Sequence, residues 1–156
     1  MEENNTNWSQ SVGCVVTRNG GKEVLLGRHT YGPGNGKLIL PGGYVKFGEL
    51  PEETAVREVL EETGIQVKPG RLLGIRCNRN DWYIMLEAEY ISGEAFAADD
   101  ENSEVVWLDA KEALQREDVP DLSKEAIEAV VYRYENALKE SFYKEESEKS
   151  YQFFLI

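Results

Sequence analysis

Short apolar runs separated by turn residues fill much of the chain, and they predict β-strands. Residues 12–17 are mostly β-branched, residues 19–21 (Asn-Gly-Gly) form a tight-turn signal, and residues 23–28 return as a second apolar run. Together these segments predict a β-hairpin. Residues 31–36 contain three glycines and a proline, which predicts a loop. Four further runs predict strands: residues 38–40, 71–77, 82–91 and 105–108.

Three segments have the periodicity and the end signals of helices. Pro51–Thr63 begins with a proline, which suits a first turn, and is followed by Gly64, which suits the position just past the end. Residues 111–115 predict a short helix. Ser123 is expected to cap a longer helix that reaches about Phe142. The apolar side of that helix is formed by Ile127, Val130, Val131, Tyr134 and Leu138.

Strands with interspersed helices predict an α/β (α+β) fold, in which a mixed β-sheet is sandwiched between helices. The chain of 156 residues has no repeat, low-complexity tract or long linker, so we expect a single domain, residues 1–156. Cys14 and Cys77 are too few for a disulfide framework. No apolar stretch has the length of a membrane span, and residues 1–10 lack a secretory core, which predicts a cytoplasmic protein.

The formal net charge of −12 changes the expected partners. A surface this acidic repels nucleic acid polymers and anionic membranes, whose binding normally needs a basic stripe. A small phosphorylated substrate then needs a cation between itself and the protein. The charge therefore points to a divalent metal.

Helical geometry gathers a set of acids within the segment Pro51–Thr63. At 100° per residue, Glu58, Glu61 and Glu62 share an arc of about 100° on one face. Carboxylates this close repel one another, and a divalent cation bound to their oxygens would relieve that cost. The alternative is a solvated acidic face. On the opposite, core-facing side of the helix we expect Val56, Val59, Leu60 and Thr63.

The loop in front of the helix favours the metal over the solvated face. Pro41, Gly42 and Gly43 allow the backbone to come close to the start of the helix. Carbonyl oxygens of such a loop can join a metal shell, and its amides can face phosphate.

The spacing of these residues resembles the Nudix box of the Nudix hydrolase family. Gly43, Glu49, residues 57–59 (Arg-Glu-Val), residues 61–62 (Glu-Glu) and residues 64–65 (Gly-Ile) fill every defining position. The resemblance covers about residues 11–131, which leaves the C-terminal helix and tail, residues 123–156, partly outside it. Leu50 stands where a Ser or Thr often caps the helix, so the cap must come from elsewhere.

The resemblance implies a site for Mg²⁺, with Mn²⁺ as a substitute. Glu58 and Glu62 are implied as metal ligands, Glu61 as a ligand or a general base, and the carbonyl of Gly42 as a further ligand. The metal would neutralise the diphosphate and lower the pKa of a water that attacks phosphorus.

Residues beyond the metal ligands complete the expected site. Arg57 is expected to pair with Glu49 and orient the cluster. Glu104 is the candidate for a loop carboxylate that assists catalysis, with Glu101 behind it, and the alternative is a solvated loop. His29 is expected to be structural. The candidates for substrate binding are Arg28, Tyr31, Lys37, Trp82 and Tyr83.

The implied reaction is hydrolysis of a diphosphate linkage in a nucleoside diphosphate derivative. Nucleoside and deoxynucleoside triphosphates, oxidised ones included, are the first expectation, giving a nucleoside monophosphate and pyrophosphate. Dinucleoside polyphosphates, ADP-ribose and nucleotide sugars are the alternatives. A catalytically silent ligand-binding regulator is an alternative of another class, which the complete box disfavours. The apolar residues 153–156 suggest a contact on the parent domain or in a homodimer.

Overall fold

A mixed β-sheet forms the centre of the structure, a computed structural model that describes residues 9–133, 139–141 and 152–155. The strand order is β3-β2-β1-β6-β5-β9-β8, while β4 pairs with β1 and β7 pairs with β2. β1 and β6 run parallel, and the other pairs are antiparallel. The strands are β1 (Ser9–Arg18), β2 (Glu23–His29), β3 (Leu38–Ile39), β4 (Gly42–Tyr44), β5 (Gln66–Cys77), β6 (Asp81–Ser92), β7 (Asn102–Asp109), β8 (Lys139–Ser141) and β9 (Gln152–Leu155).

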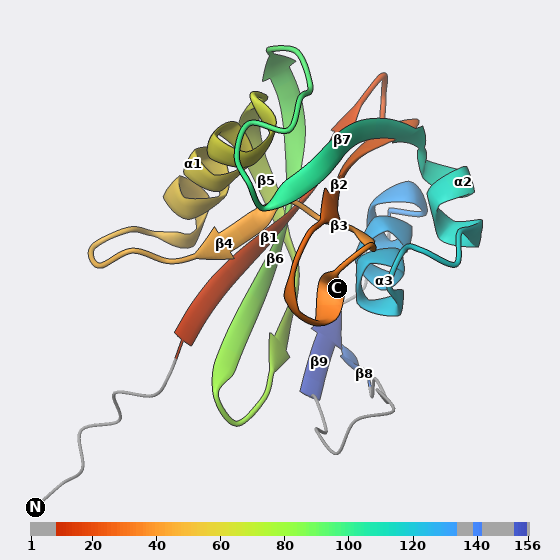
Figure 1. Cartoon of the computed structure of the whole chain (residues 1–156). Helices are drawn as coiled ribbons and strands as arrows, with labels where there is room; N and C mark the ends of the chain where they lie inside the picture. Colours follow the sequence, from red (N-terminus) through yellow and green to blue (C-terminus); the bar gives the residue numbers. More distant parts are fainter. Residues whose placement is uncertain (1–8, 134–138, 142–151, 156) are drawn as a thin grey trace, which may run out of the picture.

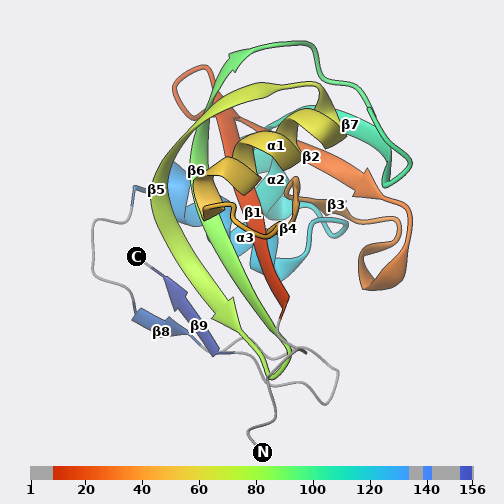
Figure 2. The same ribbon diagram turned by 90° about the vertical axis from the view of Figure 1, so that its left-hand side faces the viewer.

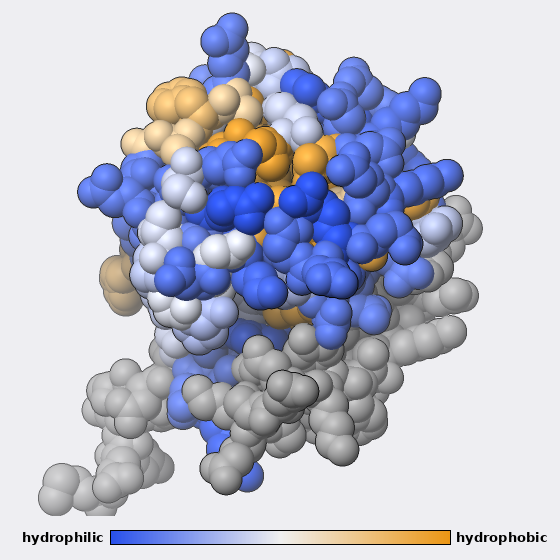
Figure 3. All heavy atoms as spheres, turned by 45° about the vertical axis from the view of Figure 1, so that its right-hand side comes forward, coloured by the Kyte–Doolittle hydropathy of each residue, from blue (hydrophilic) through white to orange (hydrophobic). Residues whose placement is uncertain are grey.

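Helices cover the sheet on two sides, which confirms the predicted sandwich. α1 (Pro51–Thr63) lies on one side, while α2 (Ala110–Gln115) and α3 (Asp121–Val131) lie on the other (Figures 1 and 2). Side chains of β1 alternate between two hydrophobic clusters: Cys14 packs in the α1 cluster, and Val15 packs in the α2–α3 cluster. The face of the molecule that carries α2 and α3 is largely hydrophilic, and apolar patches interrupt it (Figure 3).

α1 has the bounds that its end signals predict. Leu50 has no side-chain acceptor for the first turn, and the carboxylate of Glu53 instead accepts the Leu50 N–H at 2.8 Å. Gly64 adopts φ 73°, and its N–H donates to the carbonyl of Leu60 at 3.0 Å. Glu53 therefore caps the start of the helix and Gly64 caps its end.

The buried side of α1 differs from our expectation. Val56 and Leu60 are 37 % and 43 % exposed, so their predicted place in the core is wrong. The sheet instead covers the stripe Ala55, Val59 and Glu62, at i, i+4, i+7 spacing, and Glu62 is only 5 % exposed. The acidic face therefore overlaps the core-facing side.

The predicted C-terminal helix is too long. α3 begins at Asp121, with Pro120 as the N-cap, so Ser123 lies inside the helix and does not cap it. The helix ends at Val131, and Arg133 has a left-handed φ of 45°. Residues 134–138 lie outside the described part of the chain. Residues 139–141 form β8 because strand pairing overrides the helical periodicity there.

The apolar end of the chain adds a strand to its own sheet. β9 pairs antiparallel with the outer edge of β5, from Gly74 opposite Leu155 to Cys77 opposite Gln152. This pairing covers the last four residues of the β5 edge. The homodimer contact stays a prediction. Among the described residues, no helix is both long and apolar enough to cross a bilayer.

Candidate active site

A cavity of about 1100 Å³ lies beside α1, and we call it the carboxylate cavity. α1 contributes Glu58 and Glu61 to its wall, and the loop before β7 contributes Glu101. Gly42 and Gly43 of β4 form its floor next to α1. Residues 119–124, at the start of α3, form the far wall. The segments that build this cavity are therefore distant in sequence.

Glu62 is the buried acid of the site. Its carboxylate accepts the N–H of Gly42 at 3.3 Å. Burial first, and then the negative charges of Glu101, Glu58 and Asp99, raise the pKa of Glu62 to about 9. The main-chain hydrogen bond opposes this shift only in part. Glu62 therefore sits where a cation would be strongly favoured.

Arg57 holds the carboxylates of the cluster in place. Its Nε and Nη2 donate to the two oxygens of Glu49 at 2.6 and 2.9 Å, which is the expected ion pair. Its Nη1 donates to Glu58 at 2.5 Å and to Glu61 at 3.1 Å. The guanidinium also donates to the Tyr44 carbonyl. One arginine thus ties α1 to the preceding loop.

The bidentate pair has matching effects on both partners. Arg57 lowers the pKa of Glu49 to about 2, with help from the Lys46 amide and the Thr54 hydroxyl. The pKa of Arg57 is raised in turn, chiefly by Glu49. Glu49 is thus held ionised at neutral pH, and it faces Arg57 rather than the cavity.

Gly43 is required by the approach of β4 to α1. A Cβ atom at this position would lie 2.5 Å from Cδ of Glu58. Any side chain here would displace that carboxylate. The glycine of the motif therefore serves the geometry of the acid cluster.

The donor set fits a divalent cation. In the described residues, no three metal-ligating side chains converge into a preformed shell, and Arg57 holds Glu58 and Glu61. The buried Glu62 nevertheless faces further carboxylates that raise its pKa, and a cation bound among them would relieve this repulsion. Carboxylate oxygens are also the ligands that Mg²⁺ prefers. We therefore expect cation binding to shift these side chains from Arg57 toward the ion.

Comparison with known proteins agrees with this geometry. The family model described as NUDIX domain matches residues 8–130 of the chain. The chain belongs to the Nudix family.

Two relatives and one solved structure show how similar this Nudix chain is to known proteins. It is 35 % identical over 106 residues to the NAD-capped RNA hydrolase NudC of Actinobacillus succinogenes, covering 64 % of this chain but only 40 % of that protein. It is 35 % identical to a MutT-like protein of Streptomyces ambofaciens, covering 69 % of this chain and 68 % of the relative. The crystal structure of a NUDIX hydrolase from Nitrosomonas europaea has a TM-score of 0.70 at 22 % identity, covering 84 % and 74 % of the two chains.

The two loop glutamates exchange the places that we expected in the Nudix site. Glu101 lines the carboxylate cavity, and its carbonyl accepts from both the N–H and the hydroxyl of Thr30, which holds the loop. Glu104 lies within β7, opposite Arg28, and forms an ion pair with it at 2.8 Å. The structure therefore does not bring Glu104 to the cavity, because the β2–β7 register directs it to Arg28.

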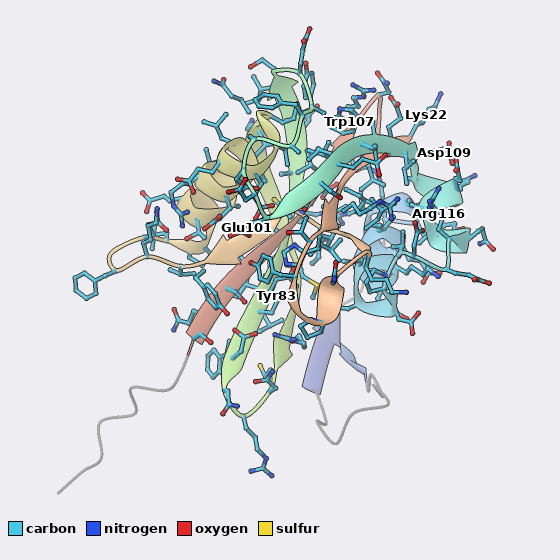
Figure 4. The ribbon with its side chains drawn as sticks, in the orientation of Figure 1. Lys22, Tyr83, Glu101, Trp107, Asp109 and Arg116 are labelled. Carbon is cyan, nitrogen blue, oxygen red and sulfur yellow. The ribbon has the colours of Figure 1, made fainter. Side chains whose placement is uncertain are left out.

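Three of the five predicted substrate-binding residues line the cavity. Tyr31, Lys37 and Tyr83 contribute to its wall. Trp82 precedes Tyr83 on β6 and does not line the cavity, since neighbouring strand residues point to opposite faces. Arg28 does not line it either, because it pairs with Glu104 and Asp118. Tyr83 and Glu101 both lie in the central part of the molecule (Figure 4).

His29 and Tyr31 form an aromatic pair on the cavity wall. Their ring centroids lie 4.2 Å apart. Burial, and after it the nearby Glu101, raise the pKa of Tyr31 to about 12. Tyr31 is thus a neutral hydrogen-bonding aromatic at neutral pH. His29, which we expected to be structural, also lines the cavity.

Several residues of the site have no signal in the sequence motif. The Nζ atom of Lys46 lies 3.7 Å from Oε1 of Glu61, beside the acid cluster. Arg76 pairs with Asp81, and its guanidinium lies over the ring of Tyr83, 5.3 Å from the centroid. Arg76 and Tyr83 are opposite each other in the β5–β6 register. To predict this pair one needs the register of β5 against β6, which the sequence does not give.

The Arg57–Glu49 pair yields a test of its orienting role. We expect Arg57→Ala or Glu49→Ala to lower turnover by about ten- to a hundredfold, because either change releases the acid cluster. The double variant should cost little more than one single change, since the partners are coupled. Steady-state kinetics on the four chains would measure this, with metal binding expected to persist in each. Fully additive losses would show that the two residues act separately.

Proposed function

We propose that this protein hydrolyses a diphosphate linkage in nucleoside diphosphate derivatives with the help of Mg²⁺. The observation that carries the proposal is the buried Glu62, whose pKa is raised by nearby carboxylates. Glu62 does not line the cavity itself, but its carboxylate accepts the N–H of Gly42, which does, and the cavity is large enough for a nucleotide. Family membership supports the reaction class. The chain spans about 40 % of the first curated relatives that it matches, so their activities support the class and not a particular substrate.

The proposed roles follow from the positions of the side chains. Glu58, Glu61 and Glu62 would hold the divalent cation, with the Gly42 carbonyl as a further ligand. A bound Mg²⁺ or Mn²⁺ supplies charge neutralisation of the diphosphate and lowers the pKa of an attacking water. Glu101 replaces Glu104 as our candidate for an additional ligand or proton acceptor, because it lines the cavity.

The cavity wall opposite α1 would bind the rest of the substrate. The His29–Tyr31 pair offers an aromatic surface, and Lys37 offers a cation near the same loop. Leu122 adds an apolar contact from α3. Stacking accepts any base and contributes roughly 1–3 kcal/mol. We therefore propose nucleoside and deoxynucleoside triphosphates, oxidised ones included, as substrates of a cytoplasmic enzyme.

A second candidate substrate class has a specific observation in its favour. The cavity of about 1100 Å³ lies at the upper end of the usual range for small-molecule sites. Dinucleotide diphosphates, dinucleoside polyphosphates, ADP-ribose and nucleotide sugars would fill it more completely than a mononucleotide. The name of the NAD-capped RNA hydrolase relative is in line with this class.

A panel of substrates tests the proposed function. We expect several nucleoside triphosphates to be cleaved between the α and β phosphates at rates within about tenfold of one another, because stacking gives little base discrimination. Kinetics with purine, pyrimidine, oxidised and dinucleotide substrates in Mg²⁺ would measure the spread. The chain without metal serves as the control.

The result of this panel distinguishes a permissive hydrolase from a specific hydrolase and from a ligand-binding regulator. A preference of a thousandfold for one compound, or turnover confined to ADP-ribose, contradicts the permissive assignment and keeps the reaction class. Tight nucleotide binding without any turnover contradicts the enzyme and indicates a ligand-binding regulator.

A further inference from the structure

A second cavity, of about 690 Å³, lies apart from the carboxylate cavity and shares no lining residue with it. It is bounded by the β1–β2 turn, by strands β5 and β6, and by the end of α3. The first turn of α3 lines the carboxylate cavity, and its last turn lines the second cavity, so the two cavities lie toward opposite ends of this helix. We call the second cavity the basic groove, after the lining residues Arg18, Lys68, Arg71 and Arg133.

The charge of the basic groove is opposite to that of the whole chain. Four of its lining residues are cationic, and Glu87 and Glu89 are its acidic ones. The complete chain carries 29 acidic and 17 basic residues. A local excess of positive charge on such a protein attracts small anions to this place.

Two of the four cations are available to a ligand. Within the described segments, neither Lys68 nor Arg133 forms an ion pair. Lys68 lies across from Glu89 in the β5–β6 register, yet the two side chains do not pair. Both cations are exposed, and they flank the groove from β5 and from the end of α3.

Arg71 presents a donor that the protein does not satisfy. Its Nε donates to Glu87 at 2.7 Å, which fixes the guanidinium. Its Nη2 is buried and has no hydrogen-bond acceptor in the described structure. This atom is closed to solvent, whereas the side chain as a whole is 38 % exposed and lines the groove, so the rest of the guanidinium is the part that an anion can meet. The guanidinium fork matches the oxygens of phosphate in particular.

The remaining wall of the groove is preorganised. The guanidinium of Arg18 lies over the Trp107 ring, 4.3 Å from its centroid, and pairs with Glu23 at 3.0 Å. Trp107 lies toward the end of β7, opposite Leu25 of β2 (Figure 4). The turn itself leaves space, because a Cβ atom built on Gly20 would meet nothing within 4 Å.

We propose that the basic groove binds a phosphate-bearing small anion at a site separate from the carboxylate cavity. The anion would accept from Arg71 and lie between Lys68 and Arg133. The volume of the basic groove suits a ligand larger than one inorganic phosphate, such as pyrophosphate or a nucleoside monophosphate. The inference does not depend on the proposed function, since the groove needs neither the metal nor the acid cluster.

Binding to the full-length chain tests the groove. Pyrophosphate and adenosine monophosphate would be titrated in the presence of a chelator, because the carboxylate cavity then repels anions. We expect the amide resonances of Gly20, Gly70 and Arg71 to shift. Lys68→Gln should weaken binding about five- to tenfold, while Lys111→Gln, with the same charge change on α2, should leave it unchanged.

The two probes distinguish the source of the phosphate. Tighter binding of pyrophosphate supports a free phosphate anion, and tighter binding of the nucleotide supports a role for the nucleoside next to Tyr90. Three results would overturn the site: resonance shifts confined to α1, equal losses in both lysine variants, or equal affinity for succinate. Turnover of Lys68→Gln is measured in a separate assay, so a loss of activity in this variant does not change the conclusion about binding in the groove.

Discussion

Glu62→Gln is expected to lower turnover with Mg²⁺ by at least about a hundredfold while the fold stays intact. The variant keeps the size of the side chain and an acceptor for the Gly42 amide, and it loses the charge at the buried position. A neutral amide is a poor ligand for a hard divalent cation. The turnover number and the Mn²⁺ affinity would therefore both fall.

Glu112→Gln provides the matched control for this experiment. It makes the same chemical change on α2, at an exposed position outside the carboxylate cavity. We expect near-normal turnover in this chain. Circular dichroism would check that both variants are folded. Near-normal activity of Glu62→Gln would show that the assignment of the buried ligand is wrong.

Without metal, the stability of the protein should fall as the pH rises. The pKa of Glu62 is raised from 4.5 to about 9 in the folded protein, so the folded state binds a proton that the unfolded chain releases. The free energy of unfolding is unaffected below the unfolded pKa. It decreases between about pH 4.5 and 9 and levels off above the folded pKa. The total change is on the order of a few kcal/mol.

Thermal unfolding in a chelator measures this effect. Between about pH 5 and 9 the wild-type Tm should fall by several degrees more than that of Glu62→Gln, whose amide does not titrate. Mg²⁺ should restore the wild-type Tm at high pH, because it binds the folded state. Equal pH profiles of the two metal-free chains would contradict the burial of an ionisable carboxyl at this position.

Local signals account for the parts of the fold that were predicted correctly. Pro51 and Gly64 define the ends of α1 by backbone conformation alone, and both act within one turn of the helix. The pairing of Arg57 with Glu49 likewise joins α1 to the short loop directly before it, over eight residues. Such features depend on residues close in sequence, and the sequence therefore contains them.

Features that depend on strand register were not predictable in this way. From the sequence we expect Glu104 rather than Glu101 of the acidic loop to assist catalysis, whereas the register of β7 on β2 places Glu104 against Arg28, and Glu101 lines the cavity. The exposure of Leu60 and the burial of Glu62 depend on where the sheet touches α1. The helical wheel gives relative angles, and it does not give the direction of the core.

The far wall of the carboxylate cavity shows the same limit. Residues 119–124 reach the site through the packing of α3 on the sheet, from positions far from the motif in sequence. Their sequence resembles any helix start. The motif therefore does not encode this part of the cavity wall.

The pairing of β9 with β5 means that the family domain and the folding unit have different lengths. The family match ends at residue 130, whereas the strand that completes the β5 edge is formed by Gln152–Leu155. A chain cut at the family boundary would retain every box glutamate and still expose a row of unpaired main-chain donors and acceptors. Such an edge recruits strands from other molecules. In the complete chain β9 occupies this part of the β5 edge, and β8 becomes the outer strand of the sheet.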